Sequence, residues 1–160
     1  MNEKKFWKII KSSRSVFAKS ADRHQERLIR ILSKKKVEDI IMFDVIFSHY
    51  MNMANTWEMR AAAHIIVEEF TEEYFSDFRG WLITRGRKTF FQILKRPDSL
   101  AKVISLRDDM DWVGYEACAL EAYERKTGHE LPPANGIKGK KWESADLPSM
   151  MPRLWRKFRR

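Results

Sequence analysis

The sequence predicts an all-α protein, a single compact bundle of about seven helices with a basic C-terminal extension. Apolar residues recur at helical spacing in successive segments, and residues that favour helix N-termini precede several of these segments. Only five Pro and six Gly interrupt the 160 residues, too few for a β-sandwich with many turns. With 44% hydrophobic residues, the chain can bury one sizeable core.

The first half of the chain predicts three helices in succession. Asn2 is expected to cap a helix that reaches about Lys19, and either Ser20 or Asp22 is expected to cap a second helix. The next run, residues 37–55, has apolar residues on nearly every side. Such a pattern is typical of a helix that its neighbours cover, so this helix is predicted to be central.

Two threonines predict the starts of the fourth and fifth helices. Thr56 is a suitable N-cap for a helix that extends to about Phe70. Thr71 is a suitable N-cap for the next helix, where Glu72 and Glu73 complement the positive end of the helix dipole.

The fifth helix contains the segment FRGWLITRGRKTFF, residues 78–91. Phe78 and Trp81 share its apolar face, and Gly80 lies nearly opposite that face. Because a glycine inside a helix costs about 1 kcal/mol relative to alanine, we expect another helix to approach closely at Gly80. Gly86 is predicted to end the helix as its left-handed residue. Arg79 lies at the edge of the apolar face, where it could stack on an aromatic ring, pair with an acid or point into a pocket.

The sequence after this motif predicts shorter elements. A sixth helix should stop before Pro97, and a small helix should follow it. A last long helix is predicted to end at Gly128, with Val113, Ala117 and Leu120 on its apolar stripe together with Tyr123. Cys118, on or near that stripe, is expected to be a buried, inert thiol.

A change in composition predicts two parts of the chain, a helical domain at residues 1–133 and a basic linker and tail at residues 134–160. The tail places Met151, Leu154, Trp155 and Phe158 on one helical face. The segment is too short to be stable alone, so we expect it to dock on the acidic body of the chain or on a partner protein rather than on a membrane.

The net charge of +9 is unevenly distributed. Residues 1–36 carry 12 Lys and Arg against 3 Asp and Glu, residues 37–133 carry 11 against 17, and residues 134–160 carry 8 against 2. Two basic ends therefore flank an acidic middle. This pattern suits either an anionic partner or basic ends that fold back onto the acidic part.

Signals for catalysis or for a cofactor are weak. His64 and Glu68 are four residues apart, but no HExxH motif is present, and we predict no metal site, no cofactor and no assigned catalytic residue. An enzyme with a site near His64, Glu68 and Arg79 remains a third hypothesis. The acidic stretch from Glu68 to Asp77 is interpreted as a solvated face with favourable charges at a helix start, although it could supply paired carboxylates.

Two groups of residues are candidates for binding a partner or a polyanion. A basic stripe on the second helix and the terminal segment could contact phosphates, and the tail aromatics could stack on bases. These candidates are Arg23, Arg27, Arg30, Lys34, Arg153, Trp155, Arg156 and Phe158.

Several segments, in order, resemble a known family. They are Phe6-Trp7, WEMRAAA at residues 57–63, FRGWLITRGR at residues 78–87, PDSLA from Pro97, and AYERKTGHELP up to Pro132. Together they resemble bacterial domain-of-unknown-function family number 4240, whose members stand alone or accompany WGR modules. The resemblance implies an α-helical domain and no established activity, and it marks Phe78, Arg79, Gly80, Trp81 and Gly86 as the motif residues.

The functional expectation is a non-catalytic protein-interaction or regulatory module. The alternative is a nucleic-acid-binding accessory protein that uses its basic ends. A lone cysteine fits a reducing compartment, and the sequence shows no signal peptide or membrane-spanning stretch, so the cytoplasm is the expected location.

Overall fold

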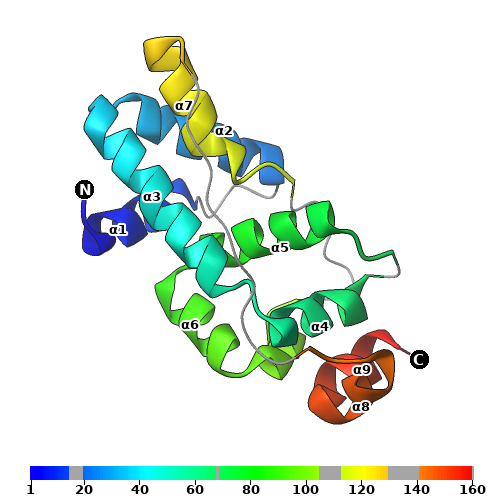
Figure 1. Cartoon of the computed structure of the whole chain (residues 1–160). Coiled ribbons are helices and arrows are strands. Elements are labelled where there is room, and N and C mark those ends of the chain that lie inside the picture. Colours follow the sequence, from blue (N-terminus) through cyan, green and yellow to red (C-terminus); the bar gives the residue numbers. More distant parts are fainter. Residues whose placement is uncertain (15–19, 68, 105–112, 130–140, 160) are drawn as a thin grey trace.

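The computed structural model describes residues 1–14, 20–67, 69–104, 113–129 and 141–159 (Figure 1). These residues form α-helices and short 3-10 helices and contain no strand, which confirms the all-α class. The elements in chain order are α1 (Glu3–Ser13), α2 (Ala21–Ser33), α3 (Val37–Met53), α4 (Trp57–Ile66), α5 (Glu72–Thr84), α6 (Arg87–Lys95), the 3-10 helix η1 (Pro97–Lys102), α7 (Ala117–Thr127), the 3-10 helix η2 (Ser144–Asp146), α8 (Leu147–Met150) and α9 (Pro152–Phe158).

Four of the helices begin at the N-caps that the sequence predicts. The side chains of Asn2, Ser20, Thr56 and Thr71 each accept a hydrogen bond from the backbone N–H three residues ahead. Each bond satisfies one N–H group that has no partner within its helix. Of the two candidates for α2, the structure uses Ser20.

An aromatic cluster from α1, α3 and α6 forms the centre of the core. Phe6 lies 4.8 Å from Phe43, and Trp7 lies 4.8 Å from Tyr50, measured between ring centroids. The Trp7 indole N–H donates to the Tyr50 hydroxyl at 3.1 Å, so the polar ends of both rings are paired inside the core. Phe90 of α6 closes the cluster at 5.3 Å from Tyr50.

Figure 1 shows how the helices are arranged. α3 crosses the molecule and packs on α1, α5 and α7, while α7 also packs on α2. The N-terminus and the C-terminal helices α8 and α9 lie at opposite ends of the molecule.

The prediction that neighbours cover α3 holds for only part of its surface. Phe43, Phe47 and Tyr50 are buried, but Met42 is 39% exposed and Val45 is 53% exposed on the other side of the helix. α3 therefore packs on the core through one face and presents apolar side chains to solvent on another.

Two helices end earlier than predicted. α1 stops at Ser13, not near Lys19, because Arg14 has an extended backbone and the Ser13 hydroxyl donates to the Ile10 carbonyl. α4 stops at Ile66, not near Phe70, because Val67 is extended. The β-branched run at the end of α4 has low helix propensity.

Gly86 does not end α5 in the predicted left-handed conformation. Arg85, which is right-handed, is the C-cap of α5, and Gly86 has φ 92° and ψ 162° as the N-cap of α6. Only glycine adopts this backbone conformation readily. Gly128, in contrast, ends α7 with φ 73° and ψ 15°, the left-handed conformation that the sequence predicts.

The predicted apolar stripe of the last long helix is wrong. Val113 is 60% exposed and Leu120 is 37% exposed, whereas Cys118, Ala119 and Ala122 are buried. Val113 precedes Gly114, which has φ 90° and separates Val113 from α7. The small side chains at Ala119 and Ala122 let α7 approach its neighbours, and this packing selects a different face.

The C-terminal helix α9 docks on the chain itself, against α4 and η1, and α8 packs on α9. Leu154 is fully buried, and the Asp98 carboxylate accepts the backbone N–H groups of Arg153 and Leu154 at 2.9 Å each, so it caps α9 from outside. Trp155 and Phe158, from the predicted apolar face of the tail, are only partly buried against the core.

Candidate functional site

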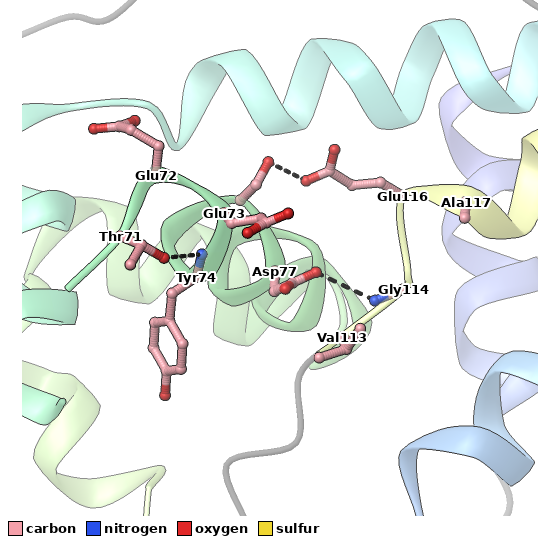
Figure 2. Close-up of a pocket in the computed structure, with 10 residues that line it drawn as sticks. Thr71, Glu72, Glu73, Tyr74, Asp77, Val113, Gly114, Glu116 and Ala117 are labelled. Carbon is pink, nitrogen blue, oxygen red and sulfur yellow. Dashed lines mark hydrogen bonds between the residues drawn. The ribbon is translucent and has the colours of Figure 1, made fainter. Parts of the chain in front are cut away.

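A surface groove lies between the N-terminal half of α5 and the turn that leads into α7 (Figure 2). Its volume is about 760 Å³. The groove is lined by Thr71, Glu72, Glu73, Tyr74, Ser76, Asp77, Val113, Gly114, Glu116 and Ala117.

Direct hydrogen bonds hold the two walls of the groove together. The Asp77 carboxylate accepts the backbone N–H of Gly114 at 3.2 Å, and the Ser76 hydroxyl donates to the Glu116 carboxylate. On the α7 side, the Gln25 amide of α2 donates to the Val113 carbonyl and fixes the turn. Three elements therefore position the groove, and Figure 2 shows the carboxylates of Glu73, Asp77 and Glu116 between its two walls, whereas the Glu72 carboxylate points away from them.

The groove carries a net negative charge. Among the residues that the structure describes, its lining includes Glu72, Glu73, Asp77 and Glu116, and no Lys or Arg. Behind the lining, the Arg60 guanidinium contacts both carboxylate oxygens of Glu72, one of them at 2.8 Å. This hydrogen bonding lowers the pKa of Glu72 below its ordinary value. Burial, together with the Asp77 charge, raises the pKa of the Tyr74 phenol to about 12.

Arg60 and Arg79, which do not line the groove, stack on the same aromatic ring. Their guanidinium carbons lie 4.5 Å and 4.7 Å from the centroid of the Phe75 ring. Arg79 also donates to the Met51 carbonyl at 3.0 Å and to the Ser76 hydroxyl at 3.1 Å. Burial lowers the pKa of Arg79 below its ordinary value. Of the three possibilities for Arg79, the structure shows the aromatic stack.

The other motif residues pack rather than line the groove. Phe78 and Trp81 belong to the core. Gly80 is buried, and a Cβ atom built there would lie 3.2 Å from Tyr115 Cβ and 3.8 Å from Phe47 Cζ. Another element therefore does approach closely at Gly80, namely the turn before α7 together with α3.

The structure separates the two predicted groups of basic residues. Arg23, Arg27, Arg30 and Lys34 are all exposed on α2. In the tail, Arg153 lies 3.7 Å from the Asp98 carboxylate and Arg156 bonds the Pro152 carbonyl. Lys157 donates to the Ile104 carbonyl at 2.7 Å, and the fold thus uses part of the tail charge to satisfy backbone carbonyls.

The residues of the enzyme hypothesis lie in different surroundings. The His64 ring packs against Phe70 at 5.8 Å and Trp142 at 5.4 Å, and burial lowers its pKa. Neither His64 nor Arg79 lines the groove. Glu68 lies outside the described residues. Within the described part of the chain, no group of three or more His, Cys, Asp or Glu side chains is placed to hold a metal ion.

A buried polar network at His24 is absent from the sequence-based prediction. Ser13 Oγ and the Tyr115 hydroxyl lie 2.9 Å from Nε2 and Nδ1 of His24, respectively. Because the Ser13 proton goes to the Ile10 carbonyl at 2.8 Å, Ser13 accepts from His24 Nε2–H and Nδ1 accepts from Tyr115. Both ring nitrogens are thus satisfied in the neutral form. Burial, followed by the charges of Arg85, Arg14 and Arg27, lowers the pKa of His24 to about 4.

Cys118 matches its prediction of a buried thiol. Its side chain is buried, and burial raises its pKa to about 12. A thiol with this pKa carries almost no thiolate near neutral pH. No helix in the described ranges is long and apolar enough to cross a membrane.

The fold and the groove define an all-helical domain with an acidic surface groove. A family model described as "Protein of unknown function (DUF4240)" matches residues 1–125, from α1 into α7 and including both walls of the groove. The chain therefore belongs to the DUF4240 family. A search of curated proteins and a search of solved structures each found no significant match.

Proposed function

We propose that this protein is a non-catalytic interaction module that binds a basic segment of another protein in the groove between α5 and the turn before α7. The observation that carries this proposal is the charge of the groove. Both walls contribute carboxylates, and although Arg60 pairs with Glu72, the described lining residues include no Lys or Arg. A segment rich in Lys and Arg complements such a surface, which increases both the association rate and the specificity.

The engagement of the groove side chains favours binding over catalysis. The Thr71 oxygen caps the Tyr74 N–H, Ser76 is bonded to Glu116, and Asp77 holds the Gly114 N–H. The hydrogen bonds of these side chains fix the shape of the groove. In the described part of its lining, no His, Cys or Lys is present that could serve as a nucleophile or as a base near neutral pH.

The groove also offers apolar contact to a bound segment. Val113 is largely exposed at its edge. A partner segment that combines cations with an apolar side chain could cover Val113 while its cations meet the carboxylates. An apolar anchor surrounded by complementary charge is a common arrangement at protein interfaces.

Peptide selection on the intact protein tests the proposal. Peptides selected from an unbiased twelve-residue display library should be enriched in Lys and Arg, and amide chemical shifts of residues 71–77 and 113–117 should move when a selected peptide is added. The double variant Glu73→Lys, Glu116→Lys should bind that peptide at least about tenfold more weakly, because two attractive charges become repulsive.

A matched control separates this site from the overall charge of the protein. The variant Glu38→Lys, Glu124→Lys makes the same charge change at exposed positions on α3 and α7 outside the groove lining. It should bind the selected peptide with nearly unchanged affinity. Equal weakening by both double variants, or selected peptides without excess cationic residues, would contradict the proposal.

A further inference from the structure

The exposed surface of α1 and α2 carries two rows of cations. On α1, Lys4, Lys8 and Lys11 lie opposite the buried side, and on α2 the row consists of Arg23, Arg27, Arg30 and Lys34. Together, Glu3–Arg14 and Ala21–Lys36 hold eleven Lys and Arg against three Asp and Glu. No large hydrophobic side chain of α1 or α2 is exposed.

Contacts to the backbone fix several of these guanidinium groups. Arg27 Nε donates to the Ser12 carbonyl at 3.0 Å and joins the α2 row to the end of α1. Arg14 Nη1 donates to the Arg85 carbonyl at 2.6 Å at the end of α5. Arg85 and Arg87 lie over the Trp81 and Phe91 rings at 5.0 Å and 5.2 Å. Arginines held in this way lose little conformational entropy when they bind a ligand.

Repulsion between positive charges is unfavourable for the fold where these arginines lie close together. After its N-cap Gly86, α6 begins with Arg87 and Lys88, and no acidic residue lies in its first turn. Cations at the positive end of a helix dipole are unfavourable. Arg14 and Arg27 contact carbonyl oxygens, and in the described residues neither is paired with a carboxylate. An anionic partner would relieve this repulsion.

We propose that the face formed by the cation rows of α1 and α2, together with the adjoining corner at Arg14, Arg85 and Arg87, binds the phosphate backbone of a nucleic-acid duplex without reading its sequence. From Arg23 to Lys34 the α2 row extends over about 16 Å, a length along which a duplex carries roughly nine phosphate charges. A regular row of cations suits a regular row of anions. The tail does not take part, because α9 is docked on α4 and η1 at the other end of the molecule.

The same surface fits other anionic partners less well. A membrane-binding helix usually buries apolar side chains below its cations, whereas no large hydrophobic side chain of α1 or α2 is exposed and Ile31 is partly buried against the core. A phosphorylated peptide is typically bound by a compact arginine cluster alone, whereas here the cations continue from the corner at Arg14, Arg85 and Arg87 along two helices.

Fluorescence anisotropy with a labelled 24-base-pair DNA duplex of mixed sequence tests the proposal on the full chain. The logarithm of the association constant should fall against the logarithm of the salt concentration with a slope of roughly −4 or steeper, about −0.9 for each phosphate contact. A second duplex of unrelated sequence should bind with the same affinity within about twofold, because phosphate contacts carry no sequence information.

Charge-removal variants locate the surface. The first variant is the triple substitution Arg23→Gln, Arg30→Gln, Lys34→Gln. It leaves Arg27 and its hydrogen bond to α1 intact, so the fold should be retained. The melting temperature checks that it is. This triple variant should bind at least about tenfold more weakly at 50 mM salt, with a slope smaller by roughly 3. Glu26→Gln should bind roughly twofold more tightly, because it removes the carboxylate that lies 3.5 Å from Arg30.

The control variant is Lys95→Gln, Arg96→Gln, Lys102→Gln, which removes the same charge from exposed positions in or near α6 and η1. It should change the affinity less than about twofold and leave the slope nearly unchanged. The proposal is overturned by equal losses in the two triple variants, by no binding at 50 mM salt, or by binding to phosphatidylserine vesicles without binding to the duplex.

Discussion

The two ends of α5 present opposite charges to solvent. At the N-terminal end, Glu72 and Glu73 follow the Thr71 cap, and the groove is acidic. At the C-terminal end, Arg85 is followed by Gly86 and Arg87, and Arg14 reaches over from α1. Negative charge is favourable at the first end of α5, and positive charge is favourable at its second end. One helix therefore supplies part of two surfaces of opposite charge.

The two ends differ in how their charges are balanced. Arg60 and Arg79 lie behind the acidic groove and compensate part of its charge. At the basic end, the arginines meet main-chain carbonyls and aromatic rings, and they surround a histidine that stays neutral. The acidic end thus has its counter-ions built in, whereas the basic end leaves more of its charge available to a partner.

Removal of Arg60 should lower the stability of the fold more than any other change, because Glu72 then loses its positively charged partner. Arg60→Ala should destabilise the fold by about 3 kcal/mol in urea unfolding, since the buried guanidinium pairs with Glu72 and packs on Phe75. Glu73→Gln on the same wall should cost less than about 0.5 kcal/mol. Similar losses for the two variants would show that Arg60 does not hold this end together.

The basic end should respond to pH through His24. Its pKa of about 4 in the fold lies below the ordinary value of 6.5, so its contribution to stability is complete above pH 6.5 and is lost as the pH falls toward 4. Between pH 7.5 and 4.5 this loss amounts to about 2.5 kcal/mol. His24→Gln should lose correspondingly less stability over that interval, as measured by urea unfolding at both pH values. Parallel losses in the two proteins would contradict the assignment of His24 as neutral.

Substitution of Gly86 tests whether the basic end of α5 depends on the unusual backbone conformation of this glycine. Gly86→Ala should cost about 2 kcal/mol, because φ 92° with ψ 162° disfavours a side chain and the new Cβ would lie 3.3 Å from Arg14. Gly128→Ala should cost only about 1 kcal/mol, since Gly128 is left-handed and nothing lies within 4 Å of a Cβ atom there. Thermal unfolding should rank the two variants in this order, and the reverse order would refute the explanation.

The smallest expected change in stability comes from removing the N-cap of α5 at Thr71. Thr71→Ala should cost about 1 kcal/mol, because the Tyr74 N–H loses its cap at 3.0 Å. Thr71→Ser should recover most of that loss in the same unfolding measurement. If serine gave no recovery, the cap would not explain the effect.

The local features of this fold could be predicted from sequence, and the features built from distant segments could not. The caps at Asn2, Thr56 and Thr71 depend on residues three positions apart. The close approach at Gly80 could be inferred from the cost of a glycine inside a helix. In contrast, the packing face of α7 depends on Gly114, which removes Val113 from the helix, and on the small residues that let its neighbours approach.

The sites required tertiary information for the same reason. His24 finds its partners 11 and 91 residues away, so no spacing rule could identify them. The acidic stretch before and within α5 was visible in the sequence as a charged helix start. Its role as one wall of a groove depends on the 113–117 turn, which Asp77 and Ser76 hold from α5.

The two proposed binding surfaces, one at each end of α5, can be tested directly by a series of separate titrations. The selected basic peptide and the DNA duplex are each titrated into the wild-type protein, into the Glu73→Lys, Glu116→Lys variant and into the Arg23→Gln, Arg30→Gln, Lys34→Gln variant. We predict that the first variant loses at least about tenfold in peptide affinity without weakening duplex binding, and that the second loses at least about tenfold in duplex affinity and keeps the peptide. If either variant weakened both ligands equally, the two surfaces would not be independent and the proposed division of α5 would be wrong.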